Sequence, residues 1–374
     1  MYGRQLPIRL LRPARGRAAR PGGAGIGPAA RRPPKCGSPA PQTAQDNRRM
    51  RYIDVDGRQL SVVGLGCWQF GEKGWGYGRD FGAAESLAIV RRALELGVTV
   101  LDTAEMYGRG ASERLVGKAL EGATGDRFLA TKFLPVVPLP QILMRHLRRS
   151  LDRLGVGHLD LYQLHWPNPL FPLGVQVEGL RRALGEGLTR YVGVSNYTLS
   201  QWRRAERLLG IPILSNQVRY NLLHTQPERR LLPHARATGH IVVAYSPLAQ
   251  GALSGRYGPG QGPGGVRRVS PLFTEEGLQA AAPVVEALRE VAAGRGASPS
   301  QVALAYLIAQ PRVVVIPGAK SVAQLEANVA AADIQLKDDE LLALRRAADL
   351  FRLSWLRVGR QMLSGTRGRV AAAP

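Results

Sequence analysis

Cysteine is scarce in this sequence, which contains only Cys36 and Cys67 among its 374 residues. A framework of disulfide bonds is therefore not expected. Neither a Cys-x-x-Cys pair nor a histidine-rich tract is present, and these are the usual sequence signs of structural zinc. We expect no metal site in this chain.

Long apolar runs are also missing. No window offers the roughly 18 uninterrupted apolar residues of a membrane-spanning helix. The composition, with 45% hydrophobic and 21% charged residues, is that of a globular protein. We therefore expect a cytoplasmic protein with no membrane partner.

The glycine pattern of a dinucleotide-binding Rossmann fold is absent as well. That fold places a Gly-x-Gly-x-x-Gly segment directly after its first strand. Here the corresponding segment, Gly64-Leu65-Gly66, is shorter and lacks the third glycine. The Rossmann fold is therefore excluded.

Acidic residues are scarce at the two ends of the chain, and the net charge of +23 is concentrated there. Residues 1–50 contain eleven basic residues against Asp46 alone, and residues 352–374 contain five arginines and no acidic residue. No basic face interleaved with aromatic residues and no known nucleic-acid motif is present. We expect no nucleic-acid partner.

The first fifty residues are rich in arginine, proline, glycine and alanine and show little apolar periodicity. Such a composition predicts a disordered tail. An arginine-rich leader poor in acids also resembles an organelle transit peptide, although serine is scarce. Because Met50 begins a natural domain start, we favour the hypothesis that translation begins there. The chain then divides into a tail (1–50), a domain (51–351) and a basic C-terminal extension (352–374).

The pattern of apolar runs in residues 51–351 predicts an α/β domain, a (β/α)8 or TIM barrel. Strand-like and helix-like segments alternate at about thirty residues per unit, as a βα repeat should. Asp56-Gly57, between Tyr52–Val55 and Gln59–Val63, predicts a β-hairpin before the barrel. Eight barrel strands are expected at Val62–Gly66, Val98–Asp102, Phe128–Thr131, Leu159–Leu164, Tyr191–Val194, Ile213–Gln217, Ile241–Ala244 and Val313–Ile316.

Four polar residues lie at or just past the ends of three of these strands. Asp102 ends one strand and Tyr107 lies in the loop that follows; Lys132 and His165 follow the next two strands. The carboxyl ends of parallel barrel strands converge on one face, where active sites are built. We expect these four side chains to share one cleft.

The chemistry of this set suits the reduction of a carbonyl group. A phenol with a pKa of about 10 is a poor acid at neutral pH, and a nearby ammonium lowers that pKa. An aspartate can anchor the ammonium, and a histidine can hydrogen-bond and orient a carbonyl oxygen. The set can therefore protonate a carbonyl oxygen while hydride reaches its carbon.

These residues belong to a series of longer motifs that runs from about Arg51 to about Leu350. The motifs are Asp102–Gly108, Thr131-Lys132, Gln163–Pro167, Gly193–Tyr197, Asn216-Gln217, Tyr245–Leu248 and Ile316–Lys320. In this order the series resembles the aldo-keto reductase family. The resemblance implies a hairpin that plugs the bottom of the barrel, and NADPH-dependent reduction of an aldehyde or ketone. Tyr107 would be the general acid, Lys132 its tuner, Asp102 the anchor of Lys132, and His165 the group that orients the carbonyl.

The resemblance also implies where an extended NADPH would lie across the top of the barrel. The residues implied near the nicotinamide are Cys67, Trp68, Ser195, Asn196, Gln217 and Tyr245; those near the pyrophosphate are Ser246, Pro247, Leu248, Gln250 and Arg256; those near the adenosine are Gly318, Lys320, Gln324 and Asn328. Lys320 precedes a helix that opens near Val322, so it would favour NADPH over NADH through the 2′-phosphate. Two positions depart from the family pattern, because Cys67 replaces a frequent threonine and Ala327 a frequent glutamate.

A loop rich in glycine and proline, Gly258–Gly265, precedes Arg267 and Arg268. Such a loop on the top face of a barrel can close over a ligand, and a family arginine near this position reaches the cofactor. We favour a lid here over a surface loop without a role.

Two other functions remain open. A Schiff-base aldolase would use Lys132 as a nucleophile. A non-catalytic NADP-binding partner protein would resemble the potassium-channel β-subunit branch of the family, but that branch has asparagine where this chain has His165. For the reductase, Trp68, Trp75, Tyr77 and Trp166 indicate an aromatic rim around a small-molecule carbonyl substrate.

Overall fold

The computed structural model describes residues 50–258, 262–264, 267 and 270–353. The predicted disordered tail and the C-terminal extension lie outside the described residues, apart from Met50, Arg352 and Leu353. Half of the predicted lid (residues 259–261 and 265) and Arg268 also lie outside them. These three features stay predictions.

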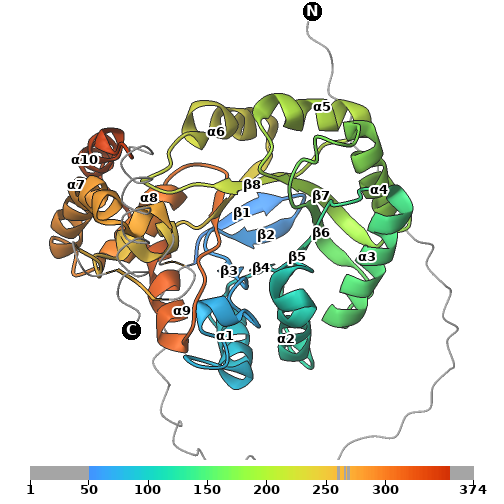
Figure 1. Cartoon of the computed structure of the whole chain (residues 1–374), viewed down its shortest axis with the longest axis horizontal. Helices are drawn as coiled ribbons and strands as arrows, with labels where there is room; N and C mark the ends of the chain where they lie inside the picture. The colour runs from blue at the N-terminus through green and yellow to red at the C-terminus, as the bar shows by residue number, and fades with distance from the viewer. Residues whose placement is uncertain (1–49, 259–261, 265–266, 268–269, 354–374) are drawn as a thin grey trace, which may run out of the picture. The chain divides into compact units, whose positions relative to one another are not determined.

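Within the described residues, eight parallel strands form a barrel (Figure 1). They are β3 (Leu65–Gly66), β4 (Val100–Asp102), β5 (Phe128–Phe133), β6 (Leu159–Leu164), β7 (Thr189–Ser195), β8 (Ser215–Arg219), β9 (Ile241–Tyr245) and β10 (Val313–Val315). Each strand pairs with the next one along the chain. The predicted (β/α)8 barrel is confirmed.

The first and last strands close the barrel. Val63 pairs with Val315 in a parallel bridge, the Gly64 amide donates to the Val315 carbonyl at 2.8 Å, and the Val315 amide donates to the Val62 carbonyl at 2.9 Å. Residues 62–64 form this contact with Val315 and are not part of β3, which is therefore shorter than the predicted Val62–Gly66. A side chain at Gly66 would place its Cβ 2.6 Å from the Ile316 carbonyl oxygen, so the close approach requires glycine there.

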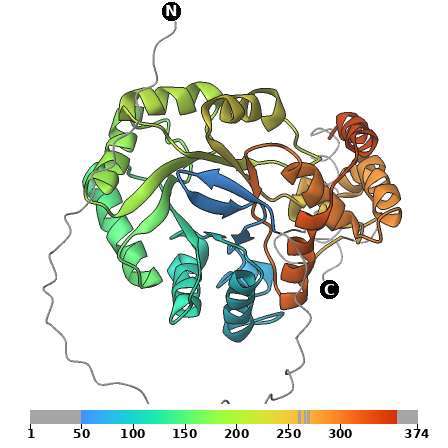
Figure 2. The ribbon, with the colours of Figure 1, turned by 180° about the vertical axis from the view of Figure 1, so that it is seen from behind.

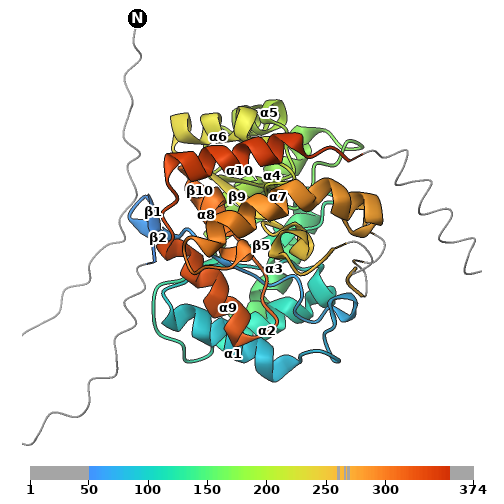
Figure 3. The same cartoon turned by 90° about the vertical axis from the view of Figure 1, so that its left-hand side faces the viewer.

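A β-hairpin covers the end of the barrel where the strands begin (Figures 1 and 3). Its strands β1 (Tyr52–Val55) and β2 (Arg58–Ser61) are antiparallel and joined by the predicted Asp56-Gly57 turn. Val55 and Leu60 belong to the apolar cluster that fills the barrel interior. The hairpin therefore plugs the bottom, as the family resemblance implied.

Helices surround the strands, and the same ring is seen from behind in Figure 2. They are α1 (Ala83–Glu95), α2 (Ala111–Leu120), α3 (Pro140–Leu154), α4 (Leu173–Gly185), α5 (Leu199–Leu209), α6 (Pro227–Thr238), α7 (Glu275–Ala293), α8 (Pro299–Ile308), α9 (Val322–Val329) and α10 (Asp338–Leu350). Helix α7 lies between β9 and α8 in the chain and packs against α10, beside it in Figure 3. None of the described helices is long and apolar enough to cross a membrane.

Candidate active site

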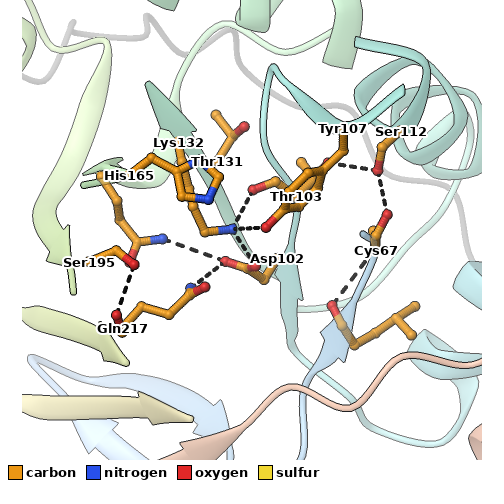
Figure 4. A network of polar contacts seen from close by, with 12 residues as sticks. Cys67, Asp102, Thr103, Tyr107, Ser112, Thr131, Lys132, His165, Ser195 and Gln217 are labelled. Atoms are coloured by element: carbon orange, nitrogen blue, oxygen red, sulfur yellow. Dashed lines mark hydrogen bonds and ion pairs between the residues drawn. The ribbon is translucent and has the colours of Figure 1, made fainter. Parts of the chain in front are cut away.

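The four predicted catalytic side chains lie together at the carboxyl ends of β4, β5 and β6 (Figure 4). Asp102 is the last residue of β4, and Tyr107 opens the short turn η2 (Tyr107–Gly110) that follows it. Lys132 lies within β5, because the strand runs two residues further than predicted and pairs Lys132 with Gln163 of β6. His165 directly follows β6.

Lys132 is the centre of this group. Its ammonium donates to Asp102 Oδ1 at 2.6 Å, to the Thr103 carbonyl at 2.8 Å and to the Tyr107 hydroxyl at 3.3 Å. The Lys132 side chain is fully buried, and that of Asp102 is 3% exposed. All three ammonium hydrogens thus have an acceptor, which satisfies a charge that would otherwise be very costly to bury.

The second carboxylate oxygen of Asp102 is held by two amides. Gln217 Nε2 donates to Asp102 Oδ2 at 2.8 Å, and Gln163 Nε2 lies 3.5 Å from the same atom. Ser195 Oγ in turn donates to the Gln217 carbonyl at 2.8 Å. Asp102 is therefore fixed from both sides, and a single orientation of its carboxylate faces Lys132.

Burial raises the pKa of Tyr107 above its ordinary value, and Lys132 opposes that shift without reversing it. The net direction is opposite to the lowering expected from the ammonium alone, because loss of solvent disfavours a phenolate more than one neighbouring charge favours it. Tyr107 therefore keeps its proton at neutral pH. A phenol in this state can donate a proton but does not act as a base.

Burial acts on Lys132 in the other direction. By itself it would lower the pKa of the ammonium, but Asp102 and Tyr107 raise that pKa above its ordinary value. Lys132 is therefore charged at neutral pH. A charged amine has no free electron pair, so it is a poor nucleophile.

His165 is a neutral imidazole beside Tyr107. Burial, with a smaller effect of Lys132, lowers the pKa of His165 to about 2. Its ring stacks on Trp166 at a centroid distance of 4.0 Å and meets the Tyr107 ring edge-on at 5.8 Å. Within the described part of the chain, His165 Nδ1 is buried with no hydrogen-bond partner.

Aromatic rings lie beside the four predicted catalytic side chains. Trp68 meets Trp75 at 5.0 Å and Tyr107 at 6.2 Å between centroids. Trp68 is 41% exposed and Trp166 is 40% exposed, so both offer apolar surface to solvent. Tyr77, expected in the same rim, packs instead edge-on against Phe81.

Several of the residues implied near a nicotinamide ring make hydrogen bonds within the chain. Asn196 has a left-handed backbone (φ 63°), donates to the His165 carbonyl at 3.2 Å and accepts from the Tyr245 hydroxyl at 2.9 Å. Cys67 is fully buried in the core, and its thiol faces the Leu65 carbonyl at 3.7 Å. Gln217 is engaged by Asp102, as described above.

The segment after β9, implied near the pyrophosphate, has an unusual backbone. Ser246, Ala249 and Gln250 all have positive φ values of 49–59°, a conformation that is costly for residues with side chains and clusters at ligand sites. Pro247 and Leu248 lie between them, and Arg256 follows the turn η3 (Ala249–Ser254) as an exposed residue. Arg267 Nη1 donates to the Gln250 carbonyl at 3.1 Å, and its guanidinium lies 5.7 Å from the Trp75 ring.

The residues implied near the adenosine lie together around the start of α9. Ser321 Oγ caps this helix by accepting from the Gln324 amide, and Gln324 Oε1 accepts from the Lys320 amide. Lys320 Nζ lies 3.7 Å from Asp80 Oδ2, with its side chain 28% exposed. Gly318 closely approaches the Gln69 side chain, and its carbonyl accepts from Asn328 Nδ2.

Two contributors to the site were not assigned their contacts from sequence. Gln163 appears in the sequence analysis only within the motif Gln163–Pro167, with no role of its own. Glu72 was not predicted to be a site residue. Its Oε1 accepts from the Gly108 amide at 2.6 Å and so holds the turn that carries Tyr107. Gln163 has a detectable signal, since alternation along β6 places it on the same inward face as Leu161. A polar residue on that face indicates a role in the site.

These features define a (β/α)8 barrel with a buried cluster of polar side chains at the end where enzymes of this fold carry their active sites. The aldo/keto reductase family model matches residues 62–349. The chain belongs to the aldo/keto reductase family, and it is therefore an oxidoreductase.

Individual relatives agree with this assignment. The chain is 48% identical over 304 residues to an uncharacterized oxidoreductase of Mycobacterium bovis, covering 81% of this chain and 94% of that protein. It is 35% identical over 304 residues to an aldo-keto reductase of Strobilurus tenacellus, covering 78% and 89%. Among solved structures, an aldo-keto reductase from Klebsiella pneumoniae in complex with NADPH is similar with a TM-score of 0.65 and 30% identity, covering 82% of this chain and 97% of that chain.

Proposed function

We propose that this protein reduces an aldehyde or ketone to the alcohol with NADPH, and that Tyr107 donates the proton. The observation that carries the proposal is the contact of the neutral Tyr107 hydroxyl with the Lys132 ammonium, which is itself anchored by Asp102. Purified protein should consume NADPH when an aldehyde or ketone is added. An absence of consumption across a broad panel of carbonyl compounds would count against the proposal.

The residues along the top of the barrel fit an extended dinucleotide. Strained backbone such as that at Ser246 and Gln250 clusters at ligand sites, and the start of helix α9 beside Lys320 favours an anionic group. Ser195, Asn196 and Tyr245 would hold the nicotinamide end, Ser246–Leu248 with Gln250 and Arg256 the pyrophosphate, and Lys320 with Gln324 and Asn328 the adenosine. When bound, NADPH supplies the hydride that adds to the carbonyl carbon.

The chain's own residues would manage the oxygen of the carbonyl group. His165, neutral and beside Tyr107, would donate a hydrogen bond that orients this oxygen. Tyr107 would then give its proton to the oxygen as negative charge develops there. Lys132 stabilises the resulting phenolate, which burial alone would disfavour, and Asp102 keeps Lys132 charged and in place.

The two alternative functions fit the site less well. A Schiff-base aldolase needs a neutral lysine, whereas Lys132 donates three hydrogen bonds, and its pKa is raised by Asp102 and Tyr107 in spite of burial. A purely cofactor-binding protein has no need for a neutral imidazole held beside a phenol. His165 and Tyr107 therefore favour catalysis.

Protonation of His165 should not contribute to the pH dependence of turnover. A pKa lowered to about 2 leaves the imidazole neutral throughout the window of about pH 5 to 8, in which an ordinary histidine titrates. We expect kcat/KM for carbonyl reduction to lack a protonation step of His165 in this window. A step in the wild-type profile that disappears in His165→Gln would contradict the neutral assignment.

Lys320→Ala should weaken NADPH binding by about one to two decades, because a charge-assisted contact contributes about 1.5–3 kcal/mol. Binding of NADH, which lacks the 2′-phosphate, should barely change. Dissociation constants of both cofactors measured by fluorescence titration test this expectation. Equal losses for the two cofactors would show that Lys320 does not contact the phosphate.

Asp80 provides a matched control for Lys320. Its carboxylate lies 3.7 Å from the Lys320 ammonium and would compete with a phosphate for that charge. Asp80→Asn should therefore keep or tighten NADPH binding. If Asp80→Asn instead lost NADPH affinity, the ion pair between Lys320 and Asp80, and not a contact of Lys320 with the phosphate, would explain the effect of Lys320→Ala.

Three further expectations from sequence stay predictions. They are the cytoplasmic location, the absence of a nucleic-acid partner, and the division of the chain at residues 50 and 351. The family match at residues 62–349 lies inside the expected domain.

A further inference from the structure

A second group of titratable side chains lies outside the strands, between α5 and α6. Glu206 comes from α5, His234 from α6, and His240 from the short connection between α6 and β9. One ligand atom from each lies within 4.8 Å of the other two. His240 directly precedes β9, and the neighbouring Ile213 lies just before β8. The group is therefore at the end of the barrel where the strands begin, whereas the proposed catalytic site is at the end where they finish.

The spacing of these atoms is close to, and in part wider than, that in the coordination shell of a small metal ion. His240 Nε2 lies 3.4 Å from Glu206 Oε1, and His234 Nε2 lies 4.0 Å from Glu206 Oε2. Two ligands in a tetrahedral zinc site, each about 2.0–2.2 Å from the metal, are about 3.3–3.6 Å apart. Small side-chain adjustments would bring all three atoms to that separation.

Neighbouring groups already orient two of the three side chains. Thr238 Oγ1 donates its only proton to the His234 carbonyl at 2.8 Å. In its second hydrogen bond, at 3.0 Å, Thr238 Oγ1 must therefore accept a proton from His240 Nδ1. The Ile213 amide donates to Glu206 Oε1 at 3.0 Å. Histidines that bind metals usually donate their second nitrogen to such a partner, and this fixes the ring.

This arrangement turns a free electron pair of His240 toward a carboxylate. With the proton on Nδ1, the Nε2 atom of a neutral ring is an acceptor, and Glu206 Oε1 opposite it is also an acceptor. His234 Nε2 also points toward Glu206; it is buried without a hydrogen-bond partner among the described residues, in a side chain only 6% exposed. A cation between His240 Nε2 and Glu206 Oε1 would relieve the repulsion of two acceptors that face one another.

Burial favours the uncharged forms of the same groups. It raises the pKa of Glu206 and lowers the pKa of both histidines, that of His240 to about 4. Imidazoles bind metal ions in their neutral form. The half-buried Glu206 carboxylate, whose side chain is 18% exposed, loses part of its hydration, and a bound cation would offset that loss.

We propose that Glu206, His234 and His240 bind one divalent ion of the zinc class, which links α5 to α6. Two imidazoles and one carboxylate are ligands that Zn²⁺ accepts, and water would complete the shell. The proposal departs from the expectation of no metal site, because the three ligands are scattered in sequence and fit no zinc motif. It does not depend on the proposed carbonyl reduction.

Two arginines set a limit on the affinity. Arg203 lies one turn before Glu206 on α5, and Arg312 donates to the His240 carbonyl at 3.0 Å. Both charges repel a cation. The site should therefore bind Zn²⁺ more weakly than a four-ligand structural site, and Arg203→Gln should tighten it.

Calorimetric titration of chelator-treated, untagged protein with Zn²⁺ tests the site. Cys36→Ser is used as the background so that its thiol cannot bind the metal. We expect one Zn²⁺ to bind per chain. The melting temperature should be a few degrees higher in excess Zn²⁺, since a ligand of the folded state stabilises that state. Glu206→Gln and His240→Gln should each weaken binding at least about 100-fold, more than loss of a second-sphere partner costs. His158→Gln, at an exposed histidine elsewhere, should bind as the parent does.

A spectroscopic readout keeps the test independent of variant stability. Co²⁺ added to the parent protein should give the intense visible bands of a four-coordinate site with nitrogen and oxygen ligands. The proposal is overturned if the parent binds no Zn²⁺, in which case the cluster holds only a proton. It is also overturned if binding survives both Glu206→Gln and His240→Gln, or if Co²⁺ gives only the weak bands of the hydrated ion.

Discussion

Tyr107→Phe should lower kcat for carbonyl reduction by about 10²–10⁴-fold, which is the usual contribution of a positioned general acid. Phenylalanine keeps the ring that meets Trp68 and His165 and removes only the hydroxyl 3.3 Å from Lys132 Nζ. Without it, no donor of suitable acidity stands beside the carbonyl oxygen. Steady-state kinetics with a saturating carbonyl substrate measure the loss.

Cofactor binding provides the control for this variant. The dissociation constant of NADPH should stay close to that of the wild type, because Tyr107 is expected to act on the carbonyl oxygen. Tyr52→Phe removes a hydroxyl that donates to the Gly97 carbonyl at 3.0 Å near the bottom of the barrel and should retain full turnover. If Tyr107→Phe keeps most of its kcat, the general-acid assignment is wrong.

Lys132→Met should affect both stability and turnover. Removing one partner of a buried ion pair usually costs about 3–5 kcal/mol of unfolding free energy, because the other charge is left uncompensated. Here that charge is Asp102, whose carboxylate is 3% exposed. Turnover should fall at least about 10²-fold, because burial then raises the pKa of Tyr107 with no ammonium to oppose it.

A double variant separates the two effects of Lys132→Met. Adding Asp102→Asn removes the uncompensated charge while Gln217 still has an oxygen to bond. Lys132→Met/Asp102→Asn should therefore regain much of the lost stability, measured by denaturant unfolding, but none of the turnover. If turnover returned together with stability, Lys132 would have only a structural role.

The fold and the four central residues could be predicted from sequence for a simple physical reason. The buried strands are short apolar runs that end in polar residues, and the carboxyl ends of parallel strands converge. Asp102, Lys132 and His165 each end or follow such a run, so convergence was expected and is observed. The Asp56-Gly57 turn of the hairpin could be predicted because such a turn needs positive φ values, which Asp and Gly tolerate and which both residues have in the structure.

Other features depend on distances that sequence does not contain. The hydrogen bond from Gln217 to Asp102 joins β8 to β4, which are not neighbours in the sheet, so no local pattern in the sequence predicts it. The net shift of the Tyr107 pKa depends on the balance of burial against a single charge at a known separation. Glu206, His234 and His240 are brought together by the packing of α5 on α6, and no local pattern marks them.

The most direct test of the central claim follows the hydride itself. Purified protein is supplied with a carbonyl compound that it accepts and with NADPH carrying deuterium at the transferable position of the nicotinamide, and the product is examined by mass spectrometry. The account predicts an alcohol with one deuterium on the former carbonyl carbon, formed by the wild type and lost in Tyr107→Phe. An alcohol without deuterium, or substrate trapped on Lys132 by borohydride with no NADPH consumed, would contradict it.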